Sequence, residues 1–243
     1  MQRFFCPSLQ QISALAGIDD AAEVHHLTRV LRLKEGEAVE LLNGQGLAGR
    51  GRIACLGKDR VDVQIDAVET APAPAAPRCI LACAIPKRSK FETIIEKATE
   101  LGVDEIVPLV TARTEYHTSR DKAERFDEVM RSAARQSRRL WFPRVHPVMP
   151  FTRSVEVLAV EGNRLFIPWL EGGRVLLKDA FAALPLPAPS AIVFFIGPEG
   201  DFTPPEAALL IGRGAVPVSL GATILRVETA AIAVAAYHAF HCR

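Results

Sequence analysis

The pattern of apolar and polar residues changes part-way along the chain. In the first part the two kinds alternate, most clearly where Val61, Val63 and Ile65 are separated by single polar residues. This period of two predicts half-buried strands, which we expect at residues 37–42, 47–56 and 61–67. Asn43-Gly44 predicts a turn between the first two of these strands, and residues 22–31 have the pattern of a short helix. Together these elements predict a small β-barrel.

In the second part, near-continuous apolar runs replace the alternation. Such runs are typical of parallel strands that are covered on both faces. We expect strands at residues 79–85, 105–110, 164–169, 191–196 and 216–220. Helices are expected between them, because capping-box sequences begin at Ser89 and at Thr203 and Gly102 can end the first helix. Alternating strands and helices predict an α/β domain.

A proline-rich segment separates the two patterns. Residues 71–77 contain three prolines and no large apolar side chain. Such a composition favours an extended linker. We therefore predict a first domain at residues 1–70, a linker at 71–78 and a second domain at 79–243.

Composition excludes several classes of protein. Of the 243 residues, 49% are apolar, which is typical of a chain with a substantial core and excludes disorder along most of it. The longest apolar runs, such as residues 191–196, are too short to cross a bilayer, and the first residues have no signal-peptide pattern. The five cysteines are scattered and lack the spacing of zinc ligands. These features predict a cytoplasmic protein with reduced thiols, no metal and no membrane association.

Basic residues form two clusters although the net charge is only +1. The first cluster contains His26, Arg29 and Arg32. The second lies on a predicted helix that places its arginines at positions i, i+4, i+7 and i+8, on one face. Its members are Arg131, Arg135, Arg138 and Arg139. Each cluster is either a solvated surface or a site for nucleic-acid phosphates, and the sequence leaves both interpretations open.

Two strand ends carry candidate chemistry. Ligands of open α/β sheets bind at the carboxyl ends of the strands. The strand at 191–196 is followed by Gly197-Pro198-Glu199-Gly200, and the strand at 216–220 by a loop that contains Arg226 and Glu228. These loops either hold a ligand or are ordinary turns. The glycine-rich phosphate loops, the zinc-protease motif and the hydrolase nucleophile elbow are absent.

These loops, taken with three other stretches, resemble the SPOUT superfamily of methyltransferases. The resemblance is closest to the family that methylates N3 of a uridine in 16S ribosomal RNA. It extends in order over nearly the whole chain. The matching stretches are His26 to Lys34 with Gly36, Glu96 to Val103, Gln136 with Arg139 and Pro143, Gly197 to Gly200, and Leu220-Gly221 with Ile224 to Ala230.

The resemblance implies a fold and a set of site residues. The first domain would be a PUA-like β-barrel that binds RNA, and the second a SPOUT α/β domain with a C-terminal trefoil knot. S-adenosylmethionine would be the cofactor, and the enzyme a homodimer acting on 16S ribosomal RNA, within the small ribosomal subunit. The cofactor-binding residues would be Leu170, Ile196, Gly197, Pro198, Glu199, Gly200, Leu220, Gly221, Ile224, Leu225 and Arg226. The RNA-binding residues would be His26, Arg29, Arg32, Arg135 and Arg139.

Catalysis would depend on Arg226 and Glu228. A cation favours the anionic base that forms when uracil N3 loses its proton, and Arg226 is the candidate for that role. Glu228 would accept the proton or orient Arg226. A purely structural salt bridge between these two residues is the alternative.

The chain departs from the family pattern at three positions. Asp201 replaces a glycine, Thr223 an arginine and Ser132 a glutamate. These departures leave open an RNA-binding assembly factor without catalytic activity. A methyltransferase of the same superfamily that acts on transfer RNA is a second alternative, and a nucleotide-dependent oxidoreductase is a third.

Overall fold

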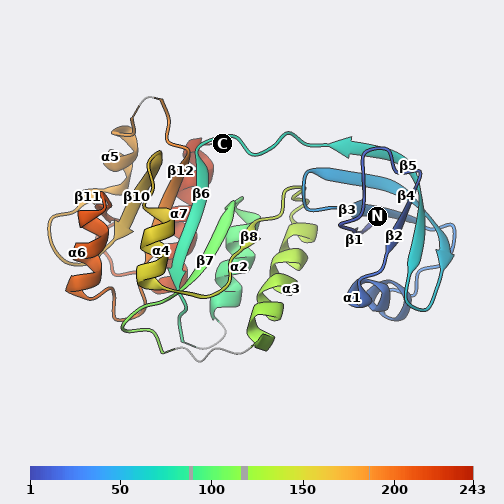
Figure 1. Ribbon diagram of the computed structural model, residues 1–243, viewed down its shortest axis with the longest axis horizontal. Helices are drawn as coiled ribbons and strands as arrows, with labels where there is room; N and C mark the ends of the chain where they lie inside the picture. The colour runs from blue at the N-terminus through green and yellow to red at the C-terminus, as the bar shows by residue number, and fades with distance from the viewer. Residues whose placement is uncertain (88–89, 116–119, 186, 243) are drawn as a thin grey trace. The chain divides into compact units, whose positions relative to one another are not determined.

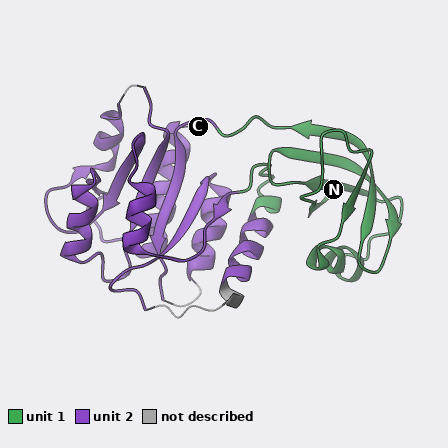
Figure 2. Ribbon diagram, in the orientation of Figure 1, with its two compact units in different colours: residues 1–74, 134–142 green, residues 75–133, 143–243 purple. Residues whose placement is uncertain are grey.

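The chain folds into two compact units. Figure 1 shows the computed structural model, which describes residues 1–87, 90–115, 120–185 and 187–242. The first unit consists of Met1–Pro74 and Ala134–Phe142, and the second of Ala75–Ala133 and Pro143–Arg243 (Figure 2). The division falls inside the proline-rich segment. The sequence prediction had placed residues 134–142 in the second domain, whereas the structure assigns them to the first unit.

The first unit is built on one strongly curved sheet, with a core inside it (Figure 1). Its strands, in spatial order, are β1 (Gln2–Phe5), β3 (Ala38–Leu42), β4 (Leu47–Leu56), β5 (Val61–Thr70) and β2 (Leu15–Ile18). β1 runs parallel to β3, and the other pairs are antiparallel. The three strands predicted from alternation are present, while β1 and β2 were not predicted.

Side-chain alternation explains how the curved sheet encloses its core. Val61 and Val63 of β5 are fully buried, whereas Gln64 between Val63 and Ile65 is exposed.

The register of β4 against β5 shifts at Gly51, where an added Cβ would lie 2.0 Å from the Gln64 carbonyl oxygen. This close approach of the two backbones requires glycine and helps to bend the sheet.

The predicted helix of the first unit is confirmed in two parts. α1 (Ala21–His25) begins at Asp20, whose side chain accepts hydrogen bonds from the backbone N–H groups of Ala22 and Glu23. It continues directly into a π-helical turn, η1 (His26–Val30).

Residues 134–142 join the first unit through backbone hydrogen bonds. The Gly46 N–H donates to the Leu140 carbonyl (3.0 Å), and the Phe142 N–H donates to the Gly44 carbonyl (2.9 Å). The Phe142 ring also stacks on Phe5, with centroids 5.4 Å apart. Apolar periodicity carries no signal for pairing of this kind, which explains why the sequence did not predict it.

The second unit contains a parallel sheet. Its strands, in spatial order, are β11 (Val175–Leu176), β13 (Val216–Ser219), β10 (Asn163–Pro168), β12 (Ala191–Ile196), β6 (Arg78–Ala84), β7 (Glu105–Val110) and β8 (Arg144–Val145), with β9 (Met149–Pro150) also paired to β7. The strand pairs of this sheet are parallel in the part of the chain that the structure describes. The five predicted strands are confirmed as β6, β7, β10, β12 and β13.

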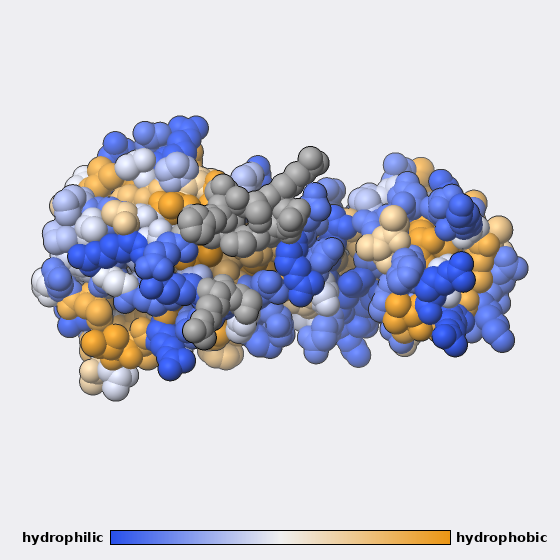
Figure 3. Space-filling model, turned by 90° about the horizontal axis from the view of Figure 1, so that it is seen from below, coloured by the Kyte–Doolittle hydropathy of each residue, from blue (hydrophilic) through white to orange (hydrophobic). Residues whose placement is uncertain are grey.

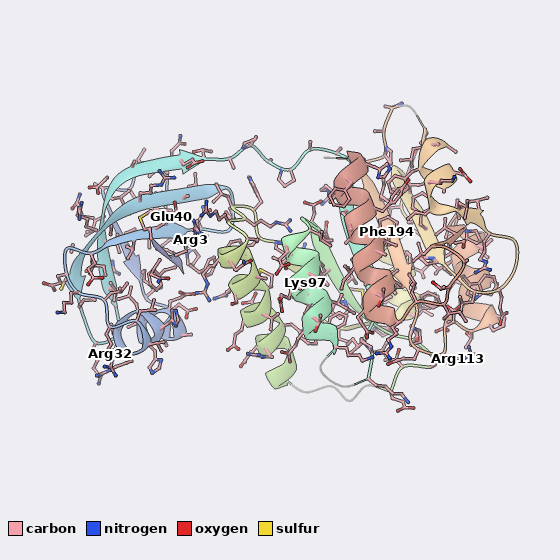
Figure 4. All side chains as sticks on the ribbon, turned by 180° about the vertical axis from the view of Figure 1, so that it is seen from behind. Arg3, Arg32, Glu40, Lys97, Arg113 and Phe194 are labelled. Atoms are coloured by element: carbon pink, nitrogen blue, oxygen red, sulfur yellow. The ribbon has the colours of Figure 1, made fainter. Side chains whose placement is uncertain are left out.

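Helices cover both faces of this sheet (Figure 1). The helices of the second unit are α2 (Lys90–Glu100), α4 (Phe151–Leu158), α5 (Leu177–Ala182), α6 (Pro204–Gly212) and α7 (Val227–Cys242). α3 (Arg120–Gln136) begins in the second unit and ends in the segment assigned to the first. Neighbouring phenylalanines of β12 show how both faces are filled. Phe195 packs with Phe151 of α4, whereas Phe194, labelled in Figure 4, stacks on Phe181 of α5, on the opposite face.

One of the two expected capping boxes lies within the described residues. Thr203 accepts a hydrogen bond from the Glu206 N–H, and the Glu206 carboxylate accepts one from the Thr203 N–H, which confirms the box at the start of α6. Ser89, the first residue of the other expected box, lies outside the described residues. The helix itself is confirmed, and the chain turns at Gly102 with a φ of 84°.

Candidate functional site

A cavity of about 350 Å³ opens where β10, β12 and β13 end. These carboxyl ends point to the lower side of Figure 1, and that side of the second unit exposes apolar surface between hydrophilic groups (Figure 3). The loops after the three strands supply most of the wall. The lining residues are Lys90, Pro168, Trp169, Leu170, Arg174, Ile196, Gly197, Pro198, Glu199, Asp201, Val218, Ser219, Leu220, Gly221, Thr223, Ile224, Leu225, Arg226, Val227, Glu228 and Ala230. A cavity of this size and position is typical of a small-molecule site.

The structure brings together nearly all the predicted cofactor-binding residues. Ten of the eleven line this cavity, and both predicted catalytic residues lie with them. Gly200 is the exception, since an added Cβ there would face the Arg113 side chain at 3.2 Å. Gly197 lines the cavity, but an added Cβ would meet Asp201 Oδ1 at 3.0 Å and the Phe202 nitrogen at 3.1 Å, within its own loop. Packing inside the loop therefore favours glycine at Gly197, since a larger residue would have to displace Asp201 or Phe202.

Asp201 connects the loop after β12 to the loop after β10. Its Oδ1 accepts a hydrogen bond from the Phe202 N–H (2.8 Å), and its Oδ2 accepts one from the Leu170 N–H (3.0 Å). The residue has a φ of 59°, a left-handed conformation that aspartate tolerates better than most residues. Burial raises the pKa of the Asp201 carboxyl, while the two N–H donors act against that rise.

Neighbouring loops hold the Gly197–Gly200 turn from the other side. The Glu199 carboxylate accepts a hydrogen bond from the Lys87 N–H (3.0 Å), and the Arg113 guanidinium donates to the Gly200 carbonyl. Figure 4 labels Arg113 at the end of the sheet where α7 begins. Glu199, which lines the cavity, therefore also connects this turn to the segment between β6 and α2.

The sequence left open a structural salt bridge between Arg226 and Glu228, but the charged residues of the cavity are paired differently. Glu228 forms an ion pair with Lys90 of α2 (3.0 Å) in place of the expected partner, Arg226. Burial acts to raise the pKa of Glu228, but hydrogen bonds from its own N–H and from Lys90, together with the charges of Lys90 and Arg226, lower it overall. Glu228 is thus ionised at neutral pH, and the Arg226 side chain is exposed at the cavity.

Sequence reasoning missed several residues of the wall. Trp169 is the last residue of the strand predicted at 164–169 and directly follows β10 in the structure, so the rule that ligands bind at strand ends could have found it. Lys90 had no such signal, because the packing of α2 against α7 brings it to Glu228 from a distant part of the chain.

The predicted RNA-binding residues divide into two groups. His26 and Arg29 are exposed on η1, and Arg32 is exposed just after it (Figure 4). Arg32 has a φ of 53°, so it does not continue the helix of Arg29. In contrast, Arg135 forms an ion pair with the buried Glu23, and Arg139 donates to the Trp141 carbonyl.

The prediction that four arginines share one helix face is wrong. α3 ends at Gln136, and Arg138 beyond it has a φ of 61°, in the left-handed region. Arg138 and Arg139 therefore lie in the turn that leads toward Trp141. Arg131 remains on α3, where it pairs with Asp127 at 2.7 Å.

The described residues contain neither a metal-binding cluster nor a membrane-spanning helix. Among the described residues, no group of three or more His, Cys, Asp or Glu side chains is arranged to hold a metal ion. No helix in the described ranges is both long enough and apolar enough to cross a membrane.

Comparison with known proteins gives the family. Residues 74–239 match the model of the RNA methyltransferase domain, and residues 18–66 match the model of the RNA methyltransferase PUA domain. The ribosomal RNA small subunit methyltransferase E of Synechocystis is 36% identical over 211 residues, which cover 86% of this chain and 68% of the relative. The chain belongs to the ribosomal RNA small subunit methyltransferase E family.

Other members of the family match over nearly their full length. The Bacillus subtilis protein of the same name is 29% identical over 95% of this chain and 93% of its own. A crystal structure of the Neisseria gonorrhoeae family member, bound to S-adenosyl methionine, superposes with a TM-score of 0.84 at 28% identity, covering 98% of this chain and 96% of that one. The two units thus correspond to the PUA-like and SPOUT domains that the resemblance implied.

Proposed function

We propose that the protein transfers a methyl group from S-adenosylmethionine to N3 of a uridine in 16S ribosomal RNA, during maturation of the small ribosomal subunit. The observation that carries the proposal is the cavity at the ends of β10, β12 and β13, which lies inside the region that matches the methyltransferase family. The reduced thiols expected from the sequence and the ribosomal substrate support the cytoplasm as its compartment.

The cavity fits the cofactor in size and in chemistry. Its volume of about 350 Å³ lies within the range of about 300–1,000 Å³ that is common for small-molecule sites. Apolar side chains of Leu170, Ile224 and Leu225 can cover an aromatic base, while the backbone around Gly221 is open, since an added Cβ there has no atom within 4 Å. The Glu228 carboxylate supplies negative charge for a cationic ligand.

We assign the cofactor to the three loops of the cavity. Backbone groups of Leu220, Gly221, Ile224 and Leu225 would hold the adenine end, and the turn that contains Ile196 to Gly200 would hold the ribose and methionine end. When bound, S-adenosylmethionine supplies a methyl group on a positively charged sulfur. The protein's part in the transfer is to hold the uracil base in line with that methyl group and to exclude water.

The charged residues act on the proton of the base. Arg226 provides the cation that stabilises the anionic uracil after N3 loses its proton. Glu228 is a weak proton acceptor, because its pKa is lowered, so the N3 proton leaves to solvent water as the base enters the site. We therefore propose that Glu228, held by Lys90, orients the charges of the site and that Arg226 acts on the base.

A methylation assay tests the proposed function. The purified protein is incubated with labelled S-adenosylmethionine and RNA from a strain that lacks its own enzyme of this family. One arm uses isolated 16S ribosomal RNA, and a second uses assembled small subunits. We expect one methyl group on one uridine, located by mass mapping, in at least one arm. RNA incubated without the protein serves as the control.

Two outcomes of this assay would contradict the proposal. Methylation of transfer RNA alone would identify a different substrate. Cofactor binding without transfer to any of these RNAs would favour the assembly factor without catalytic activity.

A second prediction concerns RNA binding by the first unit. Arg29 and Arg32 are both exposed near η1 and can contact phosphates. We expect Arg29→Glu with Arg32→Glu to weaken RNA binding about tenfold or more and to reduce the slope of log affinity against log salt by about 2, since each phosphate contact contributes about 1. Affinity for S-adenosylmethionine should not change. Fluorescence anisotropy at several salt concentrations measures the effect.

A matched variant controls for the change in net charge. Arg153 of α4 and Arg213 are exposed on the second unit, and Arg153→Glu with Arg213→Glu makes the same change in charge. We expect this control to bind RNA more tightly than the first variant. Equal affinity of the wild type and the Arg29 and Arg32 variant would show that the cluster is only a solvated surface.

We also propose that the enzyme is a homodimer and that its C-terminal segment forms the trefoil knot of the superfamily. Support for the dimer comes from α7, which has an apolar stripe that its own chain covers only in part. The stripe consists of Ala233, Ala236 and Phe240, and Phe240 is 80% exposed.

A further inference from the structure

The loop that follows β10 forms one side of the cofactor cavity and needs support from outside itself. Trp169 and Leu170 both line the cavity, and Leu170 is 48% exposed. Within the loop, Arg174 donates to the Trp169 carbonyl (3.2 Å), a contact that shapes the loop without attaching it to a neighbour. A loop with exposed apolar side chains and few buried contacts opens easily.

Asp201 supplies the connection to the next loop. One carboxylate oxygen accepts from the Leu170 N–H across the cavity edge, while the other accepts from the Phe202 N–H in the loop after β12. Both oxygens of a single side chain are thus used, one for each loop. The Asp201 N–H itself donates to the Pro198 carbonyl (2.8 Å), which fixes the carboxylate relative to the tight turn.

We propose that Asp201 is a positioning residue that fastens the loop after β10 to the loop after β12 and so forms the cofactor cavity before the cofactor binds. The inference rests on the proposed function for its ligand, but the two hydrogen bonds are properties of the protein alone. Arg113 strengthens the arrangement by holding the Gly200 carbonyl next to Asp201. The chain departs from its family here, because the usual glycine has no side chain that could make this connection.

The electrostatics agree with a carboxylate enclosed by protein. Burial is the main cause that raises the pKa of Asp201, and Glu171 in the loop after β10 raises it further. The N–H donors and the Arg113 charge act in the opposite direction. A hydrogen bond to a charged group is stronger than one between neutral groups, so the connection contributes more than an ordinary loop contact.

Asp201→Asn tests the proposal with little change in shape. Asparagine also tolerates a left-handed backbone, so the φ of 59° is retained. Its amide has one acceptor oxygen and one NH₂ donor, so it cannot accept from both Leu170 and Phe202. We expect faster amide hydrogen exchange at Leu170 in the free protein, measured by NMR or mass spectrometry. We also expect an S-adenosylmethionine Kd about tenfold weaker, since a loop that is closed only a tenth of the time lowers the apparent affinity by that factor.

Two further variants separate this role from charge and from folding. Glu171→Gln removes the neighbouring carboxylate that raises the pKa of Asp201 but does not accept the Leu170 N–H, so Leu170 exchange and Kd should stay close to the wild-type values. Asp201→Gly relieves the strain of the left-handed φ at this position and removes both hydrogen bonds. It should show the same faster Leu170 exchange and weaker Kd as Asp201→Asn, with a normal melting temperature.

The outcomes distinguish this inference from the proposed function. Wild-type exchange at Leu170 and wild-type Kd in both Asp201 variants would overturn the positioning role. If the wild-type protein fails to bind S-adenosylmethionine, the proposed function fails, yet the exchange measurement on the free protein still decides whether Asp201 holds the loop.

Discussion

Replacing Gly221 with valine is expected to abolish binding of S-adenosylmethionine. Gly221 has a φ of 133°, a conformation that side chains with a Cβ rarely adopt. It also lines the cavity, and an added Cβ would project into open space with no atom within 4 Å. Valine would therefore both strain the loop after β13 and fill volume assigned to the cofactor. We expect affinity to fall at least about a hundredfold, measured by isothermal titration calorimetry.

Gly214 provides a matched control for the strain alone. It has a φ of 87°, its added Cβ would also meet no atom within 4 Å, and it does not line the cavity. Gly214→Val should lower the melting temperature to a similar extent and keep most of the cofactor affinity. A folded Gly221→Val protein with wild-type affinity would refute the placement of the cofactor at this loop.

The same substitution at Gly197 is expected to act by a different route. The sequence suggested that a side chain there would occupy cofactor space. In the structure, an added Cβ would instead press on Asp201 and on the Phe202 backbone. Gly197→Val should therefore disturb the contact between Asp201 and Leu170, and loss of cofactor binding would follow from the displaced loop.

The sequence predicts the frame of the fold well because burial leaves a strong pattern. Each residue of β12 is apolar and buried, because the strand is covered on both faces. Such an unbroken apolar run is easy to identify in the sequence. β1 and β2 were missed because each has only four residues, too few to establish a period. The pairing of residues 134–142 with Gly44 and Gly46 depends on backbone hydrogen bonds, which any sequence can form.

Residues of the candidate site could be predicted where they lie in loops that directly follow predicted strands. Residues that reach the site from other parts of the chain could not. Gly197, Gly221 and Arg226 directly follow predicted strands or lie in a loop that does, so the carboxyl-end rule locates them. Lys90 reaches Glu228 only through helix packing. Asp201 was noticed solely as a departure from the family pattern, because a sequence cannot show which N–H groups its carboxylate accepts from.

The basic clusters show the limit of counting charges. The sequence gives no reason to distinguish Arg29 from Arg135 as an RNA-binding residue. In the structure, Arg29 is exposed, whereas Arg135 forms an ion pair with the buried Glu23. Removing one partner of such a buried pair costs about 3–5 kcal/mol. Loss of RNA binding in an Arg135 variant would therefore not separate a contact with RNA from a damaged fold, which is why the binding test uses Arg29 and Arg32.

A charge on the outer face of α7 is expected to separate the proposed dimer and to remove most of the activity. The sequence of α7 is apolar on nearly every face, and the structure divides these faces. Val234 and Ala235 are buried in their own subunit at 0% and 1% exposure, whereas Ala233, Ala236 and Phe240 lie on the opposite face at helical spacing. Ala235→Glu is therefore unsuitable as an interface test, because it would place a carboxylate in the subunit's own core.

Ala236→Glu and Phe240→Lys address the outer face directly. Small residues such as Ala233 and Ala236 let a second helix approach closely, and an unpaired charge between two such helices costs about 3–5 kcal/mol. That cost weakens the dimer at least about a hundredfold. Light scattering should show monomers at micromolar concentration. Transfer activity should fall with the dimer, since α7 begins at Val227, beside Arg226, and the resemblance places the active site near the subunit interface.

A charge at another partly exposed apolar position serves as the control. Val157 of α4 is 40% exposed, and Val157→Glu should remain dimeric and active with a near-normal melting temperature. If Ala236→Glu and Phe240→Lys both stay dimeric and active, this face of α7 is not the interface. Monomers that keep full activity would instead show that the site is complete within one subunit.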